Sequence, residues 1–159
     1  MKLKVLHIVG GPLTSGAAKG ANILHRALLK IGVDSKVLND TLHKNELKNK
    51  YLYNKKVIFV QKNFIHKVLN IFFIYFEKLL KSIFLHSPRE TFTLSLFGFD
   101  LTKQKEFKEA DIIHIHWLSQ GFIKLNSLSK IKKPIIWTMR DEWPYTGGSH
   151  YKFDFEKYE

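Results

Sequence analysis

The first 38 residues form a fixed order: an apolar segment, a glycine-rich loop, an amphipathic segment, a glycine and a second apolar segment. This order constrains the fold more than any other feature. Residues 3–9 (LKVLHIV) are apolar and rich in β-branched side chains, and a glycine-rich loop follows directly, so they predict a buried strand entering a tight turn. Apolar residues then recur at helical spacing: Ala17, Ala21, Leu24, Leu28 and Ile31. Gly32 fits a C-cap, and residues 35–38 predict a second strand. This βαβ unit implies a parallel sheet with a right-handed crossover.

The rest of the chain continues the alternation. Further strands are predicted at 56–61, 91–96, 111–117 and 135–139, and a short helix at 121–130. A long amphipathic helix is predicted from Leu69, Phe72, Phe73, Phe76, Leu79, Leu80 and Ile83, most of whose side chains we expect to pack on the sheet. The pattern predicts one α/β domain over residues 1–159, with a Rossmann-like, mostly parallel sheet flanked by helices.

Charge and composition narrow the class of protein. The net charge is +12, and residues 41–81 hold nine lysines and two acidic residues, a concentration that attracts polyanions, anionic lipid or phosphorylated small molecules. The chain has no cysteine, which excludes disulfides, thiolate zinc sites and cysteine nucleophiles. No secretory signal is visible, and the longest apolar stretch, 68–76, is far shorter than the ~20 residues that span a bilayer. We therefore expect a soluble or peripheral protein.

Three loops follow predicted strands and meet at one edge of a parallel sheet, where ligands bind in such folds. The first, residues 10–20 (GGPLTSGAAKG), matches neither the dinucleotide-binding nor the P-loop pattern. Its glycine-rich backbone before a helix nevertheless suits an anion such as a diphosphate. The alternative is a plain tight turn.

The second loop begins at the end of the predicted strand DIIHIHW. His114 and His116 point to the same face of that strand, and His116 lies nearer the ligand-binding edge, where a general base or a partner for a sugar hydroxyl would act. His114 fits a structural, hydrogen-bonded histidine better. Two histidines at this spacing could also hold a metal, but we find no carboxylate close in sequence to complete a site and expect none.

The third loop, RDEWPYTGGSHY, is dense in polar, aromatic and glycine residues. Trp143 and Tyr145 could stack on a sugar ring, and Gly147 and Gly148 would permit close approach of the backbone. Asp141 and Glu142 form a possible acid pair. The alternative is a solvated polar surface loop.

These three loops, and above all the run Trp-Thr-x-x-Asp-x-Trp-Pro-x-Thr-Gly-Gly at 137–148, carry a resemblance to a known family. The chain resembles the N-terminal domain of family 4 glycosyltransferases from bacterial exopolysaccharide and lipopolysaccharide assembly, over residues 4–38 and 94–151. The resemblance implies the acceptor-side half of a GT-B fold, in an enzyme that uses a nucleotide-diphosphate sugar, retains anomeric configuration, and needs neither a metal nor another cofactor. It implies an acceptor that is lipid-linked or a polysaccharide, at the cytoplasmic face of the membrane.

The resemblance also assigns roles to residues of this chain. It implies catalytic roles for His116 and Asp141. It implies a donor-phosphate loop at Gly10, Gly11, Ser15 and Gly16, and a cleft lined by Arg140, Trp143, Tyr145, Thr146, Gly147 and Gly148. Relatives commonly carry His where Arg140 stands, and Cys where Ser149 and Phe155 stand. The resemblance implies a donor-binding second domain that these 159 residues do not include, so we expect the chain to be a fragment that is inactive alone.

Other functions remain open at this stage. A basic nucleic-acid-binding module would account for the charge, although no helix-turn-helix, RNP, KH or zinc-finger pattern occurs, so no specific nucleic acid is expected. The basic segment 41–81 and its amphipathic helix would also suit an anionic membrane surface. A third alternative is a half-domain that pairs with a separately encoded donor domain.

Overall fold

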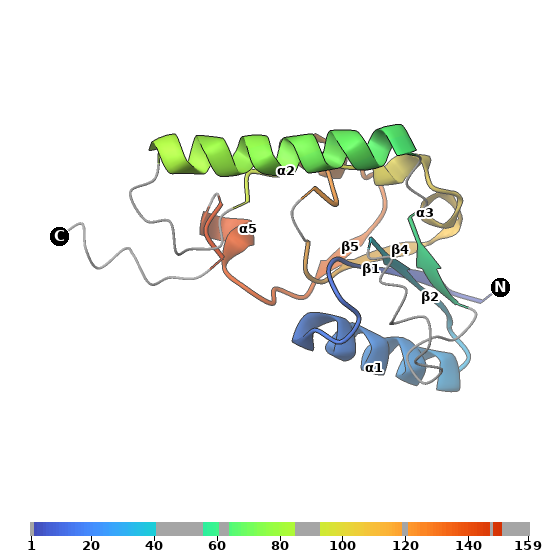
Figure 1. Cartoon of the computed structure of the whole chain (residues 1–159). Coiled ribbons are helices and arrows are strands. Elements are labelled where there is room, and N and C mark those ends of the chain that lie inside the picture. The colour runs from blue at the N-terminus through green and yellow to red at the C-terminus, as the bar shows by residue number, and fades with distance from the viewer. Residues whose placement is uncertain are drawn as a thin grey trace.

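The computed structural model describes residues 2–40, 56–60, 64–84, 93–118, 121–146 and 148–150. Its centre is a five-stranded sheet in the order β3-β2-β1-β4-β5 (Figure 1). The strands are β1 (Lys4–Val9), β2 (Asp34–Asn39), β3 (Val57–Phe59), β4 (Ile112–Ile115) and β5 (Ile135–Trp137). Every neighbouring pair is parallel, so the predicted α/β, Rossmann-like sheet is confirmed.

Helices lie on both faces of this sheet (Figure 1). They are α1 (Gly16–Lys30), α2 (Phe64–Phe84), α3 (Lys105–Glu109), α4 (Leu125–Leu128) and α5 (Trp143–Thr146), with one 3-10 turn, η2 (Leu101–Lys103). The α1 helix covers one face, and α2 and α3 lie on the other. Of the helix predicted at 121–130, only the single turn of α4 is helical.

Strand alternation divides the interior into two unequal halves. On the α3 side, Leu6 and Ile8 of β1 and Ile113 and Ile115 of β4 join the larger apolar cluster, which also holds Phe107 and Phe122. The apolar cluster on the α1 side is small: Val9, Leu13, Ala18, Ala21 and Val37. The remaining interior positions on that side are filled largely by polar side chains: His7, His25, Ser35, Asn39, His114 and His116.

The α1 helix is rotated relative to the predicted face. Its buried residues are Ala18, Ala21 and His25, whereas Ile31 is 75% exposed. Small side chains let the helix approach the sheet closely, and His25 Nδ1 lies 2.7 Å from Ser35 Oγ, which satisfies a buried polar group. Gly32, at a φ of +86°, ends the helix as expected, with the amide of Val33 donating to the carbonyl of Leu28.

The predicted strand at 91–96 is wrong within the part that the structure describes. Residues 93–96 form no strand, and Ser95 has a φ of +50°. The amide of Thr93 donates to the carbonyl of Gly148 at 2.9 Å, and the carbonyl of Ser95 accepts from the amide of Leu125 at 2.9 Å. These backbone groups bond to two loops, which leaves no strand ladder for them to join.

Most of the apolar side chains of α2 that the structure describes are exposed, against the expectation that most of them pack on the sheet. Phe72 is 61% exposed and Ile83 62%, while Glu77 is buried. Phe76 packs edge-on against Phe97, with ring centroids 6.4 Å apart. No helix among the residues described here combines the length and apolarity needed to cross a bilayer.

Candidate functional site

The three candidate loops meet at the carboxyl ends of β1, β4 and β5, as predicted. The amide of Gly10 donates to the carbonyl of Trp117 at 2.7 Å, which joins the loop after β1 to the loop after β4. The indole Nε1 of Trp117 donates to Asp141 Oδ2 at 2.6 Å, which joins the loop after β4 to the loop after β5. We call this meeting point of the three loops the carboxyl edge.

Gly11 occupies a position that only glycine suits. Its φ is +75°, a region that side chains disfavour, and a Cβ there would lie 2.9 Å from Cζ3 of Trp117. Its amide donates to Asp40 Oδ1 at 2.8 Å. The turn is thus fixed on one side by an aromatic ring and on the other by a carboxylate.

The first turn of α1 opens directly from this loop. Ser15 is the N-cap, and its Oγ accepts from the amide of Ala18 at 3.3 Å. Gly16 is exposed, and a Cβ on it would have open space around it. The first turn contains no acidic side chain, so the positive end of the helix dipole is not neutralised from within the turn.

Arg140, in the loop after β5, lies against the same helix. A Cβ built on Gly20 would stand 2.5 Å from Nη2 of Arg140, so the missing side chain makes room for the guanidinium. Arg140 is exposed, and no acidic side chain in the described part of the chain pairs with it. A free guanidinium beside the open start of a helix is suited to a phosphate.

Asp141 is held in a network of hydrogen bonds. Besides Trp117, its Oδ2 lies 2.5 Å from His150 Nδ1, and its Oδ1 accepts from the amide of Trp143 at 3.3 Å. His150 Nε2 continues the chain to Thr93 Oγ1 at 3.0 Å. The side chains of His150 and Asp141 are 2% and 7% exposed, so this carboxylate positions the loop rather than facing solvent.

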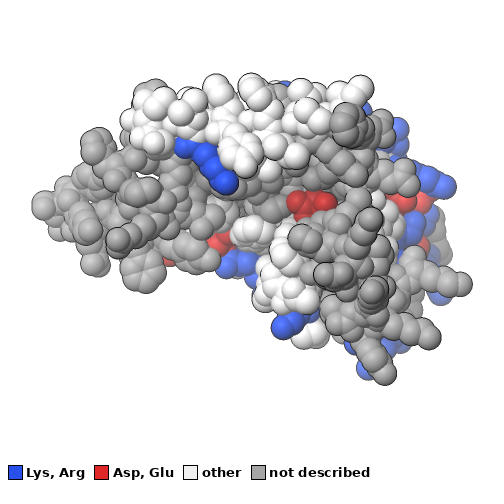
Figure 2. Space-filling model, in the orientation of Figure 1, with Lys and Arg blue, Asp and Glu red and all other residues white. Residues whose placement is uncertain are grey.

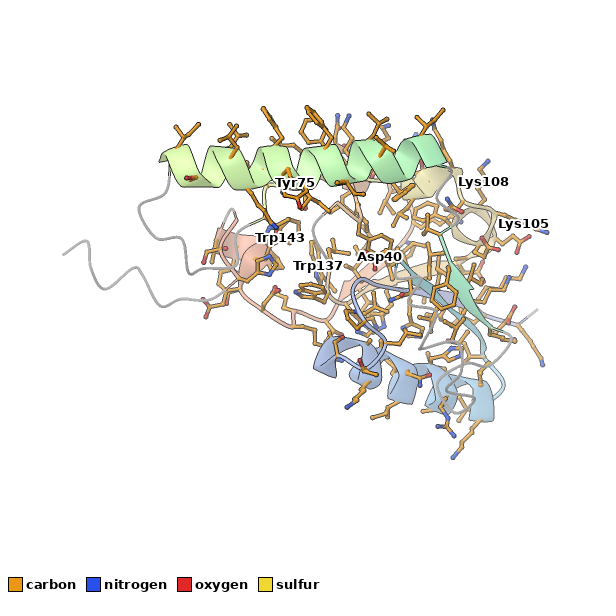
Figure 3. The ribbon with its side chains drawn as sticks, in the orientation of Figure 1. Asp40, Tyr75, Lys105, Lys108, Trp137 and Trp143 are labelled. Carbon is orange, nitrogen blue, oxygen red and sulfur yellow. The ribbon has the colours of Figure 1, made fainter. Side chains whose placement is uncertain are left out.

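The other predicted residues of the third loop have different environments. Trp143 is buried, donates from Nε1 to the carbonyl of Thr93 at 2.7 Å, and faces Trp137 with ring centroids 6.2 Å apart (Figure 3). Its predicted stacking on a sugar does not fit this burial. Tyr145 is 66% exposed and keeps a free face. Thr146 bonds to the carbonyl of Ser149, Gly148 is buried, and Gly147 lies outside the described residues.

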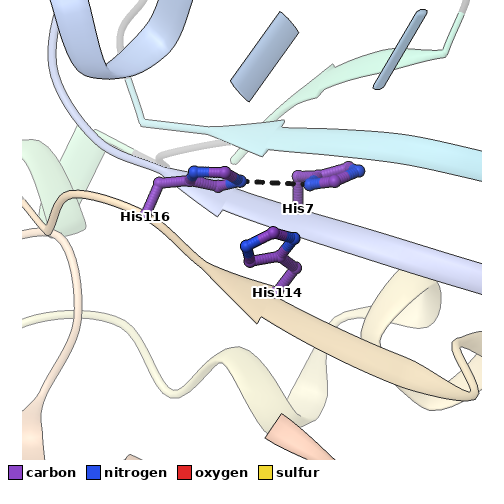
Figure 4. A group of neighbouring side chains, drawn as sticks. All are labelled: His7, His114 and His116. Atoms are coloured by element: carbon purple, nitrogen blue, oxygen red, sulfur yellow. Dashed lines mark hydrogen bonds between the residues drawn. The ribbon is translucent and has the colours of Figure 1, made fainter. Parts of the chain in front are cut away.

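His116 lies one residue beyond β4, with its side chain on the α1 face as expected. It joins His7 and His114 in a group that we call the histidine cluster (Figure 4). His116 Nε2 is 3.1 Å from His7 Nδ1, and the rings of His114 and His116 stack with centroids 4.2 Å apart. Burial lowers the pKa of His116 to about 3, helped by the nearby charges of His114 and Arg140.

Sequence reasoning missed His7, Thr93 and His150. His7 interrupts an otherwise apolar strand, and this polar position was the available signal. Its pairing with His114 became visible only with the register of β1 against β4. Thr93 and His150 are 57 residues apart, and nothing in either local sequence predicts their contact.

Comparisons of this chain with protein-family models, with curated proteins and with solved structures found no match.

Proposed function

We propose that this chain is the acceptor-side, N-terminal half of a GT-B-type glycosyltransferase, which transfers a sugar from a nucleotide-diphosphate donor to a lipid-linked or polysaccharide acceptor at the cytoplasmic face of the membrane. One observation carries the proposal. The unpaired guanidinium of Arg140 lies against α1 at Gly20, one turn from the open start of that helix. Together they form a positive site for a diphosphate at the ligand-binding edge of a parallel sheet.

The chemistry of the transfer explains why such a site is useful. The bond between the anomeric carbon and the diphosphate breaks, and the diphosphate leaves with the electron pair. The acceptor oxygen forms the new bond and releases its proton to a base. Negative charge on the leaving group grows during this step, and preorganised positive groups stabilise it without a metal. Arg140 and the α1 dipole supply that charge here, and exposed Tyr145 offers a ring face to a sugar.

His116 and Asp141, the two residues with implied catalytic roles, lie beneath this surface. His116 is 2% exposed, and Asp141 is engaged by Trp117 and His150. In the proposed enzyme Asp141 holds the three loops in register, and His116 reaches a ligand only if the carboxyl edge opens. We expect the isolated chain to bind donor diphosphate without transferring sugar.

Titration of the ¹⁵N-labelled chain with UDP, ADP and GDP tests the proposal by amide chemical shifts. We expect saturable shifts at Gly10, Gly11 and Gly16. Arg140→Gln removes a charged hydrogen-bond donor and should weaken binding about 10–100-fold. Arg26→Gln removes the same charge from an exposed position on α1 farther from its start, and it should leave binding unchanged.

Gly20→Ala offers a second, independent variant. Alanine favours a helix interior over glycine by about 1 kcal/mol, so the fold is preserved, while the new Cβ displaces the guanidinium. Diphosphate affinity should fall although the Tm does not. Equal weakening by Arg26→Gln, or tighter binding of single-stranded RNA with a steep dependence on salt, would instead favour general attraction of polyanions.

A second proposal concerns α2, where Figure 2 shows a surface of mostly uncharged residues. We propose that this face rests on an anionic membrane surface. Its exposed members are Ile65, Val68, Leu69, Phe72, Tyr75, Phe76, Leu79 and Ile83. Lys78 lies beside them, with Nζ 5.3 Å from the centroid of the Tyr75 ring. An exposed apolar helix face flanked by lysine suits insertion among anionic headgroups. Residues 41–55 of the basic segment 41–81 lie outside the described residues.

Co-sedimentation with vesicles of mixed neutral and anionic phospholipid tests this contact. Phe72→Ser should reduce the bound fraction, because it removes an apolar side chain that is 61% exposed. Ile31→Ser on α1, where the isoleucine is 75% exposed, is the matched control and should not. Equal binding by both variants, or mass that rises with concentration in light scattering without vesicles, would point to a protein partner for α2.

A further inference from the structure

The histidine cluster draws on two neighbouring strands. In the parallel register of β1 and β4, His7 lies directly opposite His114, and His116 follows two residues later on the same face. The ring of His7 is 5.0 Å from that of His114 and 5.4 Å from that of His116. All three residues are 5% exposed or less. Three imidazoles are therefore packed together between the sheet and α1.

The nitrogens of these rings converge. His7 Nδ1 and His116 Nε2 stand 3.1 Å apart, and one nitrogen from each of the three rings lies within 4.8 Å of the others. Ligand atoms of a tetrahedral zinc site, with Zn–N bonds of about 2.0–2.1 Å, are separated by about 3.3–3.4 Å. To reach that spacing, His7 Nδ1 and His116 Nε2 would separate slightly and the third nitrogen would move closer to them.

His114 already has the outer partner that a metal ligand usually has. Its Nε2 lies 2.8 Å from Thr138 Oγ1, which fixes the ring and leaves Nδ1 for coordination. In Figure 4 this ring lies below the dashed line that joins His7 to His116.

The outer nitrogens of the histidine cluster are buried and unsatisfied in the described structure. When His7 and His116 share one hydrogen bond, the second proton of the pair sits on an outer nitrogen, either His7 Nε2 or His116 Nδ1. Neither atom has a hydrogen-bond partner in the described structure. An ion bound by the inner nitrogens, His7 Nδ1 and His116 Nε2, would leave both outer nitrogens protonated and without a partner, which lowers the affinity of the site.

We propose that His7, His114 and His116 bind one Zn²⁺ ion, or a similar borderline divalent transition-metal ion, between the sheet and α1. Three histidines leave a fourth position open, as in zinc sites that keep a water. The site goes beyond the proposed transferase and does not depend on it. It ties β1 to β4 just below the carboxyl edge and occupies Nε2 of His116.

The surroundings limit the affinity. No carboxylate belongs to the cluster, and the positive charge of Arg140 is felt at His114 and His116. Only one of the three histidines has an outer hydrogen-bond partner, and each missing partner weakens a site about 10–100-fold. We therefore expect a 1:1 site that chelators empty readily.

Titration of the metal-free chain with Co²⁺ and with Zn²⁺ tests the site. We expect the intense visible absorption of tetrahedral Co²⁺, its displacement by one equivalent of Zn²⁺, and a Tm that rises with Zn²⁺ concentration. His7→Gln, His114→Gln and His116→Gln should each abolish the absorption. His25→Gln, a buried histidine that bonds to Ser35 instead, should retain it.

Two further variants control for misfolding and for metal binding by other histidines. Thr138→Val keeps all three ligands but removes the outer partner of His114, and should weaken Zn²⁺ binding about 10–100-fold. Combined replacement of His43, His66 and His86 by Gln should leave the site intact. Absorption that is lost with those three residues, a Co²⁺ spectrum that is octahedral, or a Tm indifferent to Zn²⁺ would overturn the proposal.

Discussion

The indole Nε1 of Trp117 donates to Asp141 Oδ2 at 2.6 Å, and the same carboxylate oxygen lies 2.5 Å from His150 Nδ1. The two partners come from different loops, so one buried acid fixes the geometry of the carboxyl edge. The run Trp-Thr-x-x-Asp-x-Trp-Pro at 137–144 supplies that acid. Three members of this run make contacts elsewhere in the fold: Thr138 with His114 of β4, Asp141 with Trp117, and Trp143 with the carbonyl of Thr93.

Asp141→Ala should destabilise the protein. It leaves a nitrogen of the buried His150 and the N–H of the partly buried Trp117 without this partner, and a buried unpaired group costs about 1–3 kcal/mol. Asp34→Ala removes the partly exposed ion pair with Lys56, for which about 0–1 kcal/mol is expected. Urea unfolding followed by tryptophan fluorescence measures both. Equal losses in the two variants would show that the Asp141 network contributes nothing beyond a surface contact.

Gly98 should be intolerant of a side chain. A Cβ there would lie 2.5 Å from the backbone carbon of Ile123 and 2.7 Å from the amide nitrogen of Lys124, and backbone cannot move aside as a side chain does. Gly98→Ala should therefore destabilise by about 1–3 kcal/mol. Gly16→Ala, which meets open space at the start of α1, is the control and should be neutral or slightly stabilising. A stable Gly98→Ala variant would contradict the close approach at the Phe99–Ile123 bridge.

Much of the fold was predictable because it depends on local order. The strand–glycine–helix–glycine–strand pattern of the first 38 residues specifies β1, α1 and β2, and the Schellman-type end of α1 follows from Gly32 alone. The failures are at 91–96 and α2. Alternating Thr and aromatic residues suit a strand, but the groups of Thr93 and Ser95 bond to distant loops, which no local pattern encodes.

The candidate site, like the fold, was predictable only in part. That three loops meet at one edge follows from a parallel sheet, and the common face of His114 and His116 follows from strand alternation. The sequence pattern does not predict which helix faces are buried. The apolar stripe of α2 points outward, and α1 buries His25 in place of Leu24. His7 became a candidate only through its register with His114.

Stability of the metal-free protein should fall with pH below the ordinary histidine range. Burial lowers the pKa of His7 and of His116 to about 3. The unfolded chain therefore binds protons near pH 6.5 that the folded chain does not bind. The stabilising contribution is present above pH 6.5 and is lost as pH falls toward 3, at about 1.4 kcal/mol per pH unit for each histidine. Urea unfolding between pH 7 and 4, in the presence of a chelator, measures the slope. His7→Gln should flatten it, and an unchanged slope in that variant would contradict the shift.

Glu77 should have the opposite dependence on pH. It is buried on α2, and burial raises the pKa of its carboxyl, partly offset by the amides of Leu94 and Leu96. A raised folded pKa makes the group most favourable below its unfolded value of about 4.5, and that advantage is lost as pH rises through the folded pKa. Glu77→Gln should therefore raise the Tm at pH 7, by about 2–4 °C for each kcal/mol recovered, and the difference should vanish near pH 4. A variant that is less stable at pH 7 would mean that the ionised carboxylate anchors α2 through those two amides, and that the outward apolar face is held in place by this anchor.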